Sequence, residues 1–177
     1  MLTIFFYQIR ENMIEIANLQ AYSRRENIEI FGVPDNINQR DLEPTVVDIL
    51  NSIGVNISSY DIAGCHRLKR ERYAKSSNVI VRFTNRKDAY NAIKYSYRLM
   101  NNNCREEMGN NLFIRENLCP SYKSIFKKCY ALYKTNKVND VYTKNGKVFL
   151  QINANEKSNY ISSFDILEQI NSKYNIF

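Results

Sequence analysis

The sequence is poor in the residues from which metal sites and catalytic sites are usually built. It contains one histidine, His66, and its four cysteines show no C-x-x-C spacing. We therefore expect neither a zinc site nor a framework of disulfides. A glycine-rich phosphate loop and an acidic cluster with metal-ligand spacing are also missing. His66 lies between Cys65 and Arg67 on a predicted strand, where packing against a sheet is commoner than acid–base catalysis. The sequence thus predicts a protein that is not an enzyme and needs no metal or cofactor.

Long apolar runs are missing as well. No stretch approaches the roughly 20 apolar residues that a membrane-spanning helix needs, so no membrane insertion is expected. The apolar opening LTIFF has no basic leader and is followed by Arg10, which is unlike a signal peptide. Together with the scattered cysteines, these absences favour an intracellular location, in the cytoplasm or the nucleus.

Positive charge and hydrophobic residues are what the chain does contain. Lysine and arginine total 25 against 18 acidic residues, which gives a formal net charge of +7. Such a balance favours a polyanion as the partner. Hydrophobic residues make up 44% of the 177 positions, which is enough to bury the core of one medium domain or two small ones.

The first 25 residues predict a helix with a short coiled-coil pattern. Apolar residues recur at heptad positions, namely Leu2, Phe5, Ile9, Ile16 and Leu19. The pattern covers fewer than three heptads, and the polar Asn12 occupies one core position. Two interpretations stay open: a helix that joins copies of the chain into an oligomer, or a single helix packed on the domain behind it.

Residues 26–118 predict a domain in which strands and helices alternate. The expected strands span 27–34, 60–69, 78–83 and 111–117, and the expected helices span 42–53 and 85–100. On the second helix, Ala89, Ile93 and Tyr97 are expected to face inward. The order strand, helix, strand, strand, helix, strand is the ferredoxin-like split βαβ pattern. The RNA-recognition motif (RRM) is the commonest nucleic-acid-binding use of that pattern.

The open face of this expected sheet lacks the rings on which an RRM stacks bases. If Ile28 and Ile30 face the core, Glu29 takes the ring position of the first strand, and Asn78 and Ile80 take those of the third. None of these three residues is aromatic, so the usual stacking platform is not expected. A ferredoxin-like domain that binds only proteins therefore stays open as an alternative.

Cations are expected to supply the binding surface instead. Arg82 is predicted to project from the open face, Arg115 to share a strand face with Phe113, and Arg67 to lie on the outer face of the second strand. The expected nucleic-acid-binding cations are Arg24, Arg25, Arg67, Lys69, Arg70, Arg72, Lys75, Arg82 and Arg115. Guanidinium groups hold phosphates bidentately and stack on bases, so this surface favours a single-stranded backbone over a sequence-reading pocket.

Residues 119–177 predict a small helix–hairpin–helix domain. A basic helix begins at Pro120, a two-residue turn at 145–146 (Asn-Gly) joins two strands, and a short amphipathic helix covers 162–170. Tyr142 and Lys144 share a strand face by alternation, and Lys147 follows the turn. A base could stack on the tyrosine ring while the lysines hold its phosphates. The alternative is a tyrosine that belongs to the core.

Five segments of the chain resemble one protein family in the same order. They are YSRRENIEIFGVP, DIAGCHRL, NVIVRF, LFIRENLCP and VYTKNGKVFLQI. Over about residues 16–170 the chain resembles the first-open-reading-frame proteins of LINE-type retrotransposons and the related few-polyhedra (FP) proteins of baculoviruses. The resemblance implies a trimerising coiled coil, an RNA-recognition domain and a C-terminal domain that bind single strands and chaperone their annealing. Carried over by position, its binding residues are Arg24, Arg25, Arg67, Arg82, Tyr142, Lys144 and Lys147.

The sequence therefore predicts an α+β chain of three parts, namely 1–25, 26–118 and 119–177. Its expected function is non-enzymatic binding of single-stranded RNA or DNA, with RNA preferred. If the first helix joins copies of the chain, the resemblance implies a homo-trimer. The viral branch of the resemblance implies the alternative, an FP-type structural or assembly factor that acts in virion production through protein–protein contacts.

Overall fold

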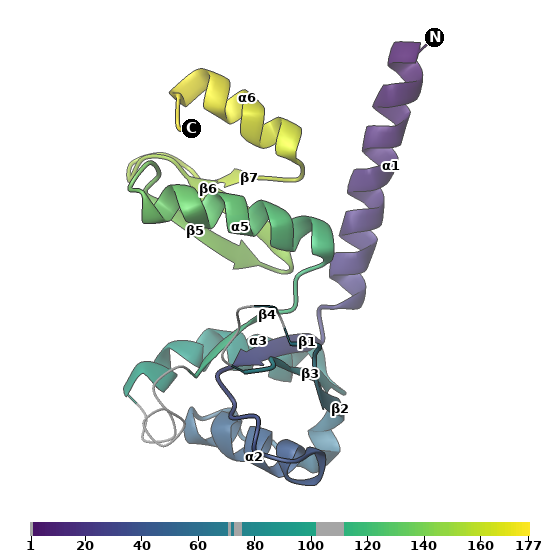
Figure 1. The fold of residues 1–177 in the computed structure, drawn as a ribbon, viewed down its shortest axis with the longest axis vertical. Coiled ribbons are helices and arrows are strands. Elements are labelled where there is room, and N and C mark those ends of the chain that lie inside the picture. The colour runs from purple at the N-terminus through teal and green to yellow at the C-terminus, as the bar shows by residue number, and fades with distance from the viewer. Residues whose placement is uncertain (1, 71, 73–75, 102–111) are drawn as a thin grey trace. The chain divides into compact units, whose positions relative to one another are not determined.

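The computed structural model describes residues 2–70, 72, 76–101 and 112–177, with side chains from residue 4 onward and none at 100 and 101 (Figure 1). The chain forms two units, one made of Met1–Arg24 with Leu118–Phe177 and one made of Arg25–Asn117. The expected α+β class is confirmed. The N-terminal segment, expected as a separate part, belongs to the same unit as the C-terminal part of the chain.

A four-stranded antiparallel sheet forms the centre of the unit Arg25–Asn117. Its strands are β1 (Asn27–Phe31), β2 (Ile62–Arg67), β3 (Val79–Phe83) and β4 (Phe113–Glu116), in the order β2-β3-β1-β4. Alternate residues of β1 and β3 belong to the hydrophobic core, as expected from their period of two: Ile28, Ile30, Val79 and Val81. The residues between them form the open face of this sheet.

Two helices supply the other side of that core. The elements are α2 (Gln39–Ser52), η1 (Ser59–Asp61), α3 (Arg86–Tyr95) and η2 (Ser96–Asn101). Helix α2 is capped by Asn38 and buries a stripe of apolar residues at helical spacing, Leu42, Val46, Ile49 and Leu50. On α3, Ala89 and Ala92 are buried and Ile93 is half-buried. The inward position predicted for Tyr97 is wrong: the α-helix changes to a 3₁₀ helix at Ser96, which turns Tyr97 to solvent.

The other unit combines three helices with a small sheet. Its elements are α1 (Leu2–Ser23), α5 (Pro120–Lys134), β5 (Asp140–Lys144), β6 (Lys147–Gln151), β7 (Asn159–Tyr160) and α6 (Phe164–Tyr174). The strand order is β5-β6-β7, and α5 lies along the β5–β6 hairpin (Figure 1). Asn145 and Gly146 have φ values of 55° and 73°, which confirms the predicted turn. Strand β7 was not expected, because two residues are too few to produce a pattern.

Helix α1 is part of this unit through one of its faces. Ala17 and Ala21 are buried in the same core as α5 and the sheet. Arg10 forms an ion pair of 3.0 Å with Asp165 at the start of α6. The turn residue Gly146 lies so close to α1 that a Cβ at this position would stand 3.1 Å from the Cβ of Ala21. Glycine is thus required here both by the positive φ and by this close approach.

Candidate nucleic-acid interface

Three aromatic side chains cross the small sheet as a continuous row, which we call the aromatic strip: Tyr142, Phe149 and Tyr160. Tyr142 pairs with Phe149 across β5 and β6, and Phe149 pairs with Tyr160 across β6 and β7. The first two rings are stacked at 5.4 Å between centroids with 11° between planes, and the second pair is tilted at 5.7 Å. Tyr142 at the outer end is 38% exposed. The strip offers the kind of ring surface on which unpaired bases stack.

Two lysines stand beside the aromatic strip at the hairpin turn. Lys144 is exposed and pairs across the turn with Lys147. By alternation Lys144 lies on the face of Tyr142, as the sequence predicted. The Lys147 ammonium lies 5.0 Å from the centroid of the Tyr160 ring. The arrangement places positive charge next to rings, so one strand of nucleic acid could meet a stacking surface and phosphate ligands together.

The inner end of the aromatic strip is fixed by hydrogen bonds to α1. The hydroxyls of Tyr122 and Tyr160 contact each other, and both donate to Oδ1 of Asn18, at 2.8 and 3.1 Å. Tyr122 is fully buried, and burial together with the Tyr160 hydroxyl raises its pKa above the ordinary value. Its hydroxyl therefore stays protonated and remains a donor. Tyr160 is held in place, whereas Tyr142 is open to a ligand.

A group of exposed cationic side chains follows β2 in the sequence. Lys69, Arg70 and Arg72 are all exposed, and Lys75, expected in the same group, lies outside the described residues. Arg70 forms an ion pair of 3.7 Å with Asp35. An ion pair between such exposed side chains is weak, so a phosphate can replace the carboxylate as the partner of Arg70.

Arg67 does not lie on the outer surface that the sequence predicted. Its guanidinium donates hydrogen bonds to the carbonyl oxygens of Val33, Pro34, Ile37 and Ser77 and to the carboxylate of Asp35. The side chain is only 19% exposed. These bonds join the loop after β1 to the residues before β3, so Arg67 stabilises the fold instead of presenting a free cation.

A register shift in β2 explains the position of Arg67. The pairing of β2 with β3 shifts between Ile62 and Gly64. Without the extra residue, alternation would place Arg67 on the open face. With it, His66 takes the open face and Arg67 pairs with the core-facing Val79. One inserted residue turns every later side chain of a strand to the other face.

Two of the three remaining predicted arginines, Arg25 and Arg82, lie near the carboxylate of Glu26. Arg82 is 66% exposed on the open face, with Nη2 3.9 Å from Oε2 of Glu26. Nε of Arg25 lies 3.8 Å from the other oxygen of Glu26, and most of that side chain is covered. Arg24 is half-buried just after α1. Arg82 is therefore the most accessible of the three arginines.

A second group of aromatic side chains lies on the open face of the larger sheet. Phe31 and Phe113 pair across β1 and β4, with stacked rings 4.4 Å apart and 10° between planes. The Arg115 guanidinium lies 4.7 Å from the Phe113 centroid and 5.5 Å from that of Phe31. We call these three residues the Phe–Phe–Arg cluster. The shared face of Phe113 and Arg115 was predicted, whereas the stacking of Phe31 on Phe113 was missed, because no sequence pattern gives the register between two strands so far apart in the chain.

The centre of the same open face is polar. Glu29 occupies the position predicted for it, but it is buried, and its Oε1 accepts a hydrogen bond of 2.6 Å from the amide of Asn117. Ile80, its partner on β3, is half-buried. The middle of the sheet thus offers no ring, in agreement with the sequence, and the rings lie toward the β4 edge.

Comparisons with known proteins give no family for the chain. No protein-family model and no curated protein matches it. Within the described ranges no group of three histidine, cysteine or acidic residues could hold a metal ion. The helices in those ranges include none long and apolar enough to cross a membrane. Cys65 and Cys129 are free thiols, and burial raises the pKa of each to about 11, so neither is a ready nucleophile.

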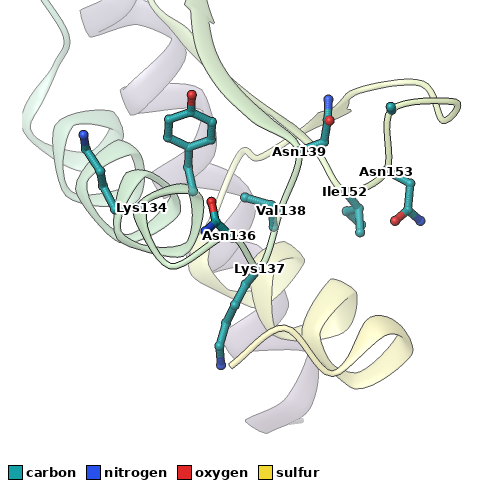
Figure 2. Close-up of a pocket in the computed structure, with 9 residues that line it drawn as sticks. Lys134, Asn136, Lys137, Val138, Asn139, Ile152 and Asn153 are labelled. Atoms are coloured by element: carbon teal, nitrogen blue, oxygen red, sulfur yellow. The ribbon is translucent and has the colours of Figure 1, made fainter.

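A polar hollow lies beside the end of α5 (Figure 2). Its volume is about 690 Å³, and its lining comes from residues 133, 134, 136–139 and 152–154, with Lys134 and Lys137 as its cations. Figure 2 shows these two lysines pointing away from each other. The Lys134 ammonium lies 5.4 Å from the ring of Tyr130. Two diverging amines do not grip one phosphate, so the hollow adds general positive charge and no defined anion site.

The predicted oligomerisation residues lie on an apolar face of α1 that no described residue of the chain covers fully. Phe5, Ile9, Ile16 and Leu19 are between 40% and 69% exposed. The side chain of Leu2 lies outside the described residues. One side of α1 packs on its own unit through Ala17 and Ala21, and the heptad side is exposed. Oligomerisation through the heptad side stays a prediction.

Proposed function

We propose that this chain is a non-enzymatic protein that binds single-stranded nucleic acid, with RNA preferred, and helps strands to anneal. The observation that carries the proposal is the aromatic strip of Tyr142, Phe149 and Tyr160 beside Lys144 and Lys147. Rings accept any base, and lysines hold phosphates without reading sequence. A protein that grips strands in this way is suited to chaperoning them.

The larger sheet supports an RRM-like assignment of the unit Arg25–Asn117. We infer this assignment from the strand order β2-β3-β1-β4 and from the two helices packed on one side of the sheet. This is the arrangement expected of a ferredoxin-like domain. The resemblance to LINE-type first-open-reading-frame proteins and FP proteins points to the same domain in the same place.

The salt dependence of binding tests the electrostatic part of this proposal. If five or six phosphates are neutralised, log affinity should fall against log salt with a slope of about −4, from roughly 0.7 per contact on single strands. Fluorescence anisotropy with a labelled oligonucleotide measures the slope. The double variant Arg70→Ala, Arg72→Ala should flatten it by about one unit without favouring any base sequence. A slope near zero for the unmodified chain contradicts the mechanism.

The exposed face of α1 favours a second candidate role, assembly of several copies, as in an FP-type structural factor. Ile9 and Ile16 lie on this face, so the double variant Ile9→Asp, Ile16→Asp should yield a folded monomer where the unmodified chain is a trimer. That monomer should bind long single strands more weakly, because avidity is lost. Sedimentation velocity measures the assembly.

The control for the added charge is Tyr7→Asp. Tyr7 is 63% exposed and lies at the heptad position opposite the predicted core positions, so this variant should keep the assembly of the unmodified chain. An unmodified chain that is monomeric at tens of micromolar contradicts the assembly role.

A further inference from the structure

We propose that the Phe–Phe–Arg cluster, made of Phe31, Phe113 and Arg115, is a second base-stacking site that takes an unpaired nucleobase. The inference rests on the proposed function, because its ligand is the same single strand that the aromatic strip binds. It goes further by assigning a base site to the larger sheet, at the edge of the open face and away from its polar centre.

The stacked pair leaves one ring surface available for a further ring. Phe31 covers one face of Phe113, at 4.4 Å and 10°. Strand β4 is the last strand in the order β2-β3-β1-β4, and no strand among the described residues pairs with its outer side. Phe113 is 39% exposed. A planar base can therefore extend the stack on the outer face of Phe113, at the usual spacing of aromatic rings.

Arg115 adds a positively charged, planar guanidinium to the site. Its guanidinium lies 4.7 Å from the Phe113 centroid, so a base stacked on Phe113 would also lie close to the guanidinium. Guanidinium planes stack on bases and donate to phosphates, which makes the cluster complementary to a nucleotide on both counts. An acidic or purely aliphatic ligand would use only one of these two features.

The surrounding open face agrees in charge with a polyanion. Arg82 projects from β3 on the same face with 66% of its side chain exposed, and its Nη2 lies 3.9 Å from Glu26, whose side chain is 27% exposed. Glu29 lies opposite Arg115 across β1 and β4, but it is buried and accepts a hydrogen bond from Asn117. Both carboxylates are thus more covered than the Arg82 guanidinium, so phosphates beside a base at Phe113 would meet exposed cations first.

A single tryptophan provides the direct test, because the chain contains none. Phe113→Trp places a fluorescent ring at the site, and a stacked base quenches its emission. We expect quenching by oligouridylate that saturates at the concentration at which anisotropy shows binding. The matched control is Tyr90→Trp, an exposed position on α3, the helix that packs against the other face of the sheet. This control should show no quenching.

A substitution series completes the test. Phe113→Ala should weaken binding of oligouridylate by about tenfold, from the roughly 1–3 kcal/mol of one stacked base, and Phe113→Tyr should leave it nearly unchanged. Normal binding by Phe113→Ala, or unquenched Phe113→Trp with oligonucleotide bound, overturns the inference while leaving the proposed function intact. The inference is also overturned if the tryptophan of Phe113→Trp is shielded from solvent and its emission does not respond to oligouridylate. That result would show that another part of the chain covers the cluster. Absence of any binding by the unmodified chain overturns both.

Discussion

Replacing Tyr142 by alanine is expected to weaken binding of a single-stranded oligonucleotide by about tenfold or more, whereas Tyr142→Phe should change it little. Tyr142 forms the exposed end of the aromatic strip, stacked on Phe149 at 5.4 Å. Stacking on one aromatic ring stabilises a bound base by roughly 1–3 kcal/mol, and the phenol hydroxyl takes no part in it. Anisotropy titrations of the two variants and the unmodified chain measure the difference.

The matched control for this prediction is Tyr133→Ala. Tyr133 is 40% exposed, close to the 38% of Tyr142, and belongs to α5, the helix that packs on the opposite face of the small sheet. Both alanine variants should melt near the temperature of the unmodified chain, because neither ring is buried. Equal binding by Tyr142→Ala and Tyr133→Ala in folded protein would show that the aromatic strip is not the interface, and the assembly role would then be favoured.

Replacing Arg67 by alanine is expected to lower the free energy of unfolding by about 3 kcal/mol. The guanidinium satisfies four backbone carbonyls and the Asp35 carboxylate. Removing a charged donor from a covered network leaves acceptors unsatisfied, and each of these costs about 1–3 kcal/mol, less where water replaces the donor. Urea denaturation followed by circular dichroism measures the change. Arg67→Lys should also lose most of this stability, since one ammonium cannot reach the same acceptors.

Arg82→Ala is the control that separates the two kinds of arginine. Arg82 is 66% exposed and its ion pair with Glu26 is long, at 3.9 Å, so its loss should change stability by less than about 0.5 kcal/mol. It should instead weaken nucleic-acid binding and reduce the salt slope. The structural role of Arg67 is contradicted if Arg67→Ala is as stable as the unmodified chain and loses binding as Arg82→Ala does.

Local patterns in the sequence predicted most of the elements. The period of two in β1 and β3, the apolar stripe of α2 and the turn at Asn145 and Gly146 each depend on residues within about one element of each other. Side-chain direction could therefore be inferred wherever the strand stays regular. The lysines beside Tyr142 were found in this way, because alternation within one hairpin is a local property.

Contacts between distant residues could not be predicted in the same way. Tyr160 joins the aromatic strip through β7, a strand of two residues that leaves no pattern. Phe31 stacks on Phe113, 82 residues later in the chain, only because β4 pairs with β1. Asn18 reaches the hydroxyls of Tyr122 and Tyr160 only because α1 packs on the C-terminal unit.

The sequence by itself determined the composition of the candidate interface: an excess of cations, a tyrosine and two lysines on one hairpin, and a heptad face on the first helix. The tertiary structure decided which of these groups a ligand can reach. A single register shift in β2 turned Arg67 inward, while the pairing of β7 with β6 brought Tyr160 to Phe149. The physical reason is that side-chain type and period are properties of short segments, whereas exposure depends on which segments pack together.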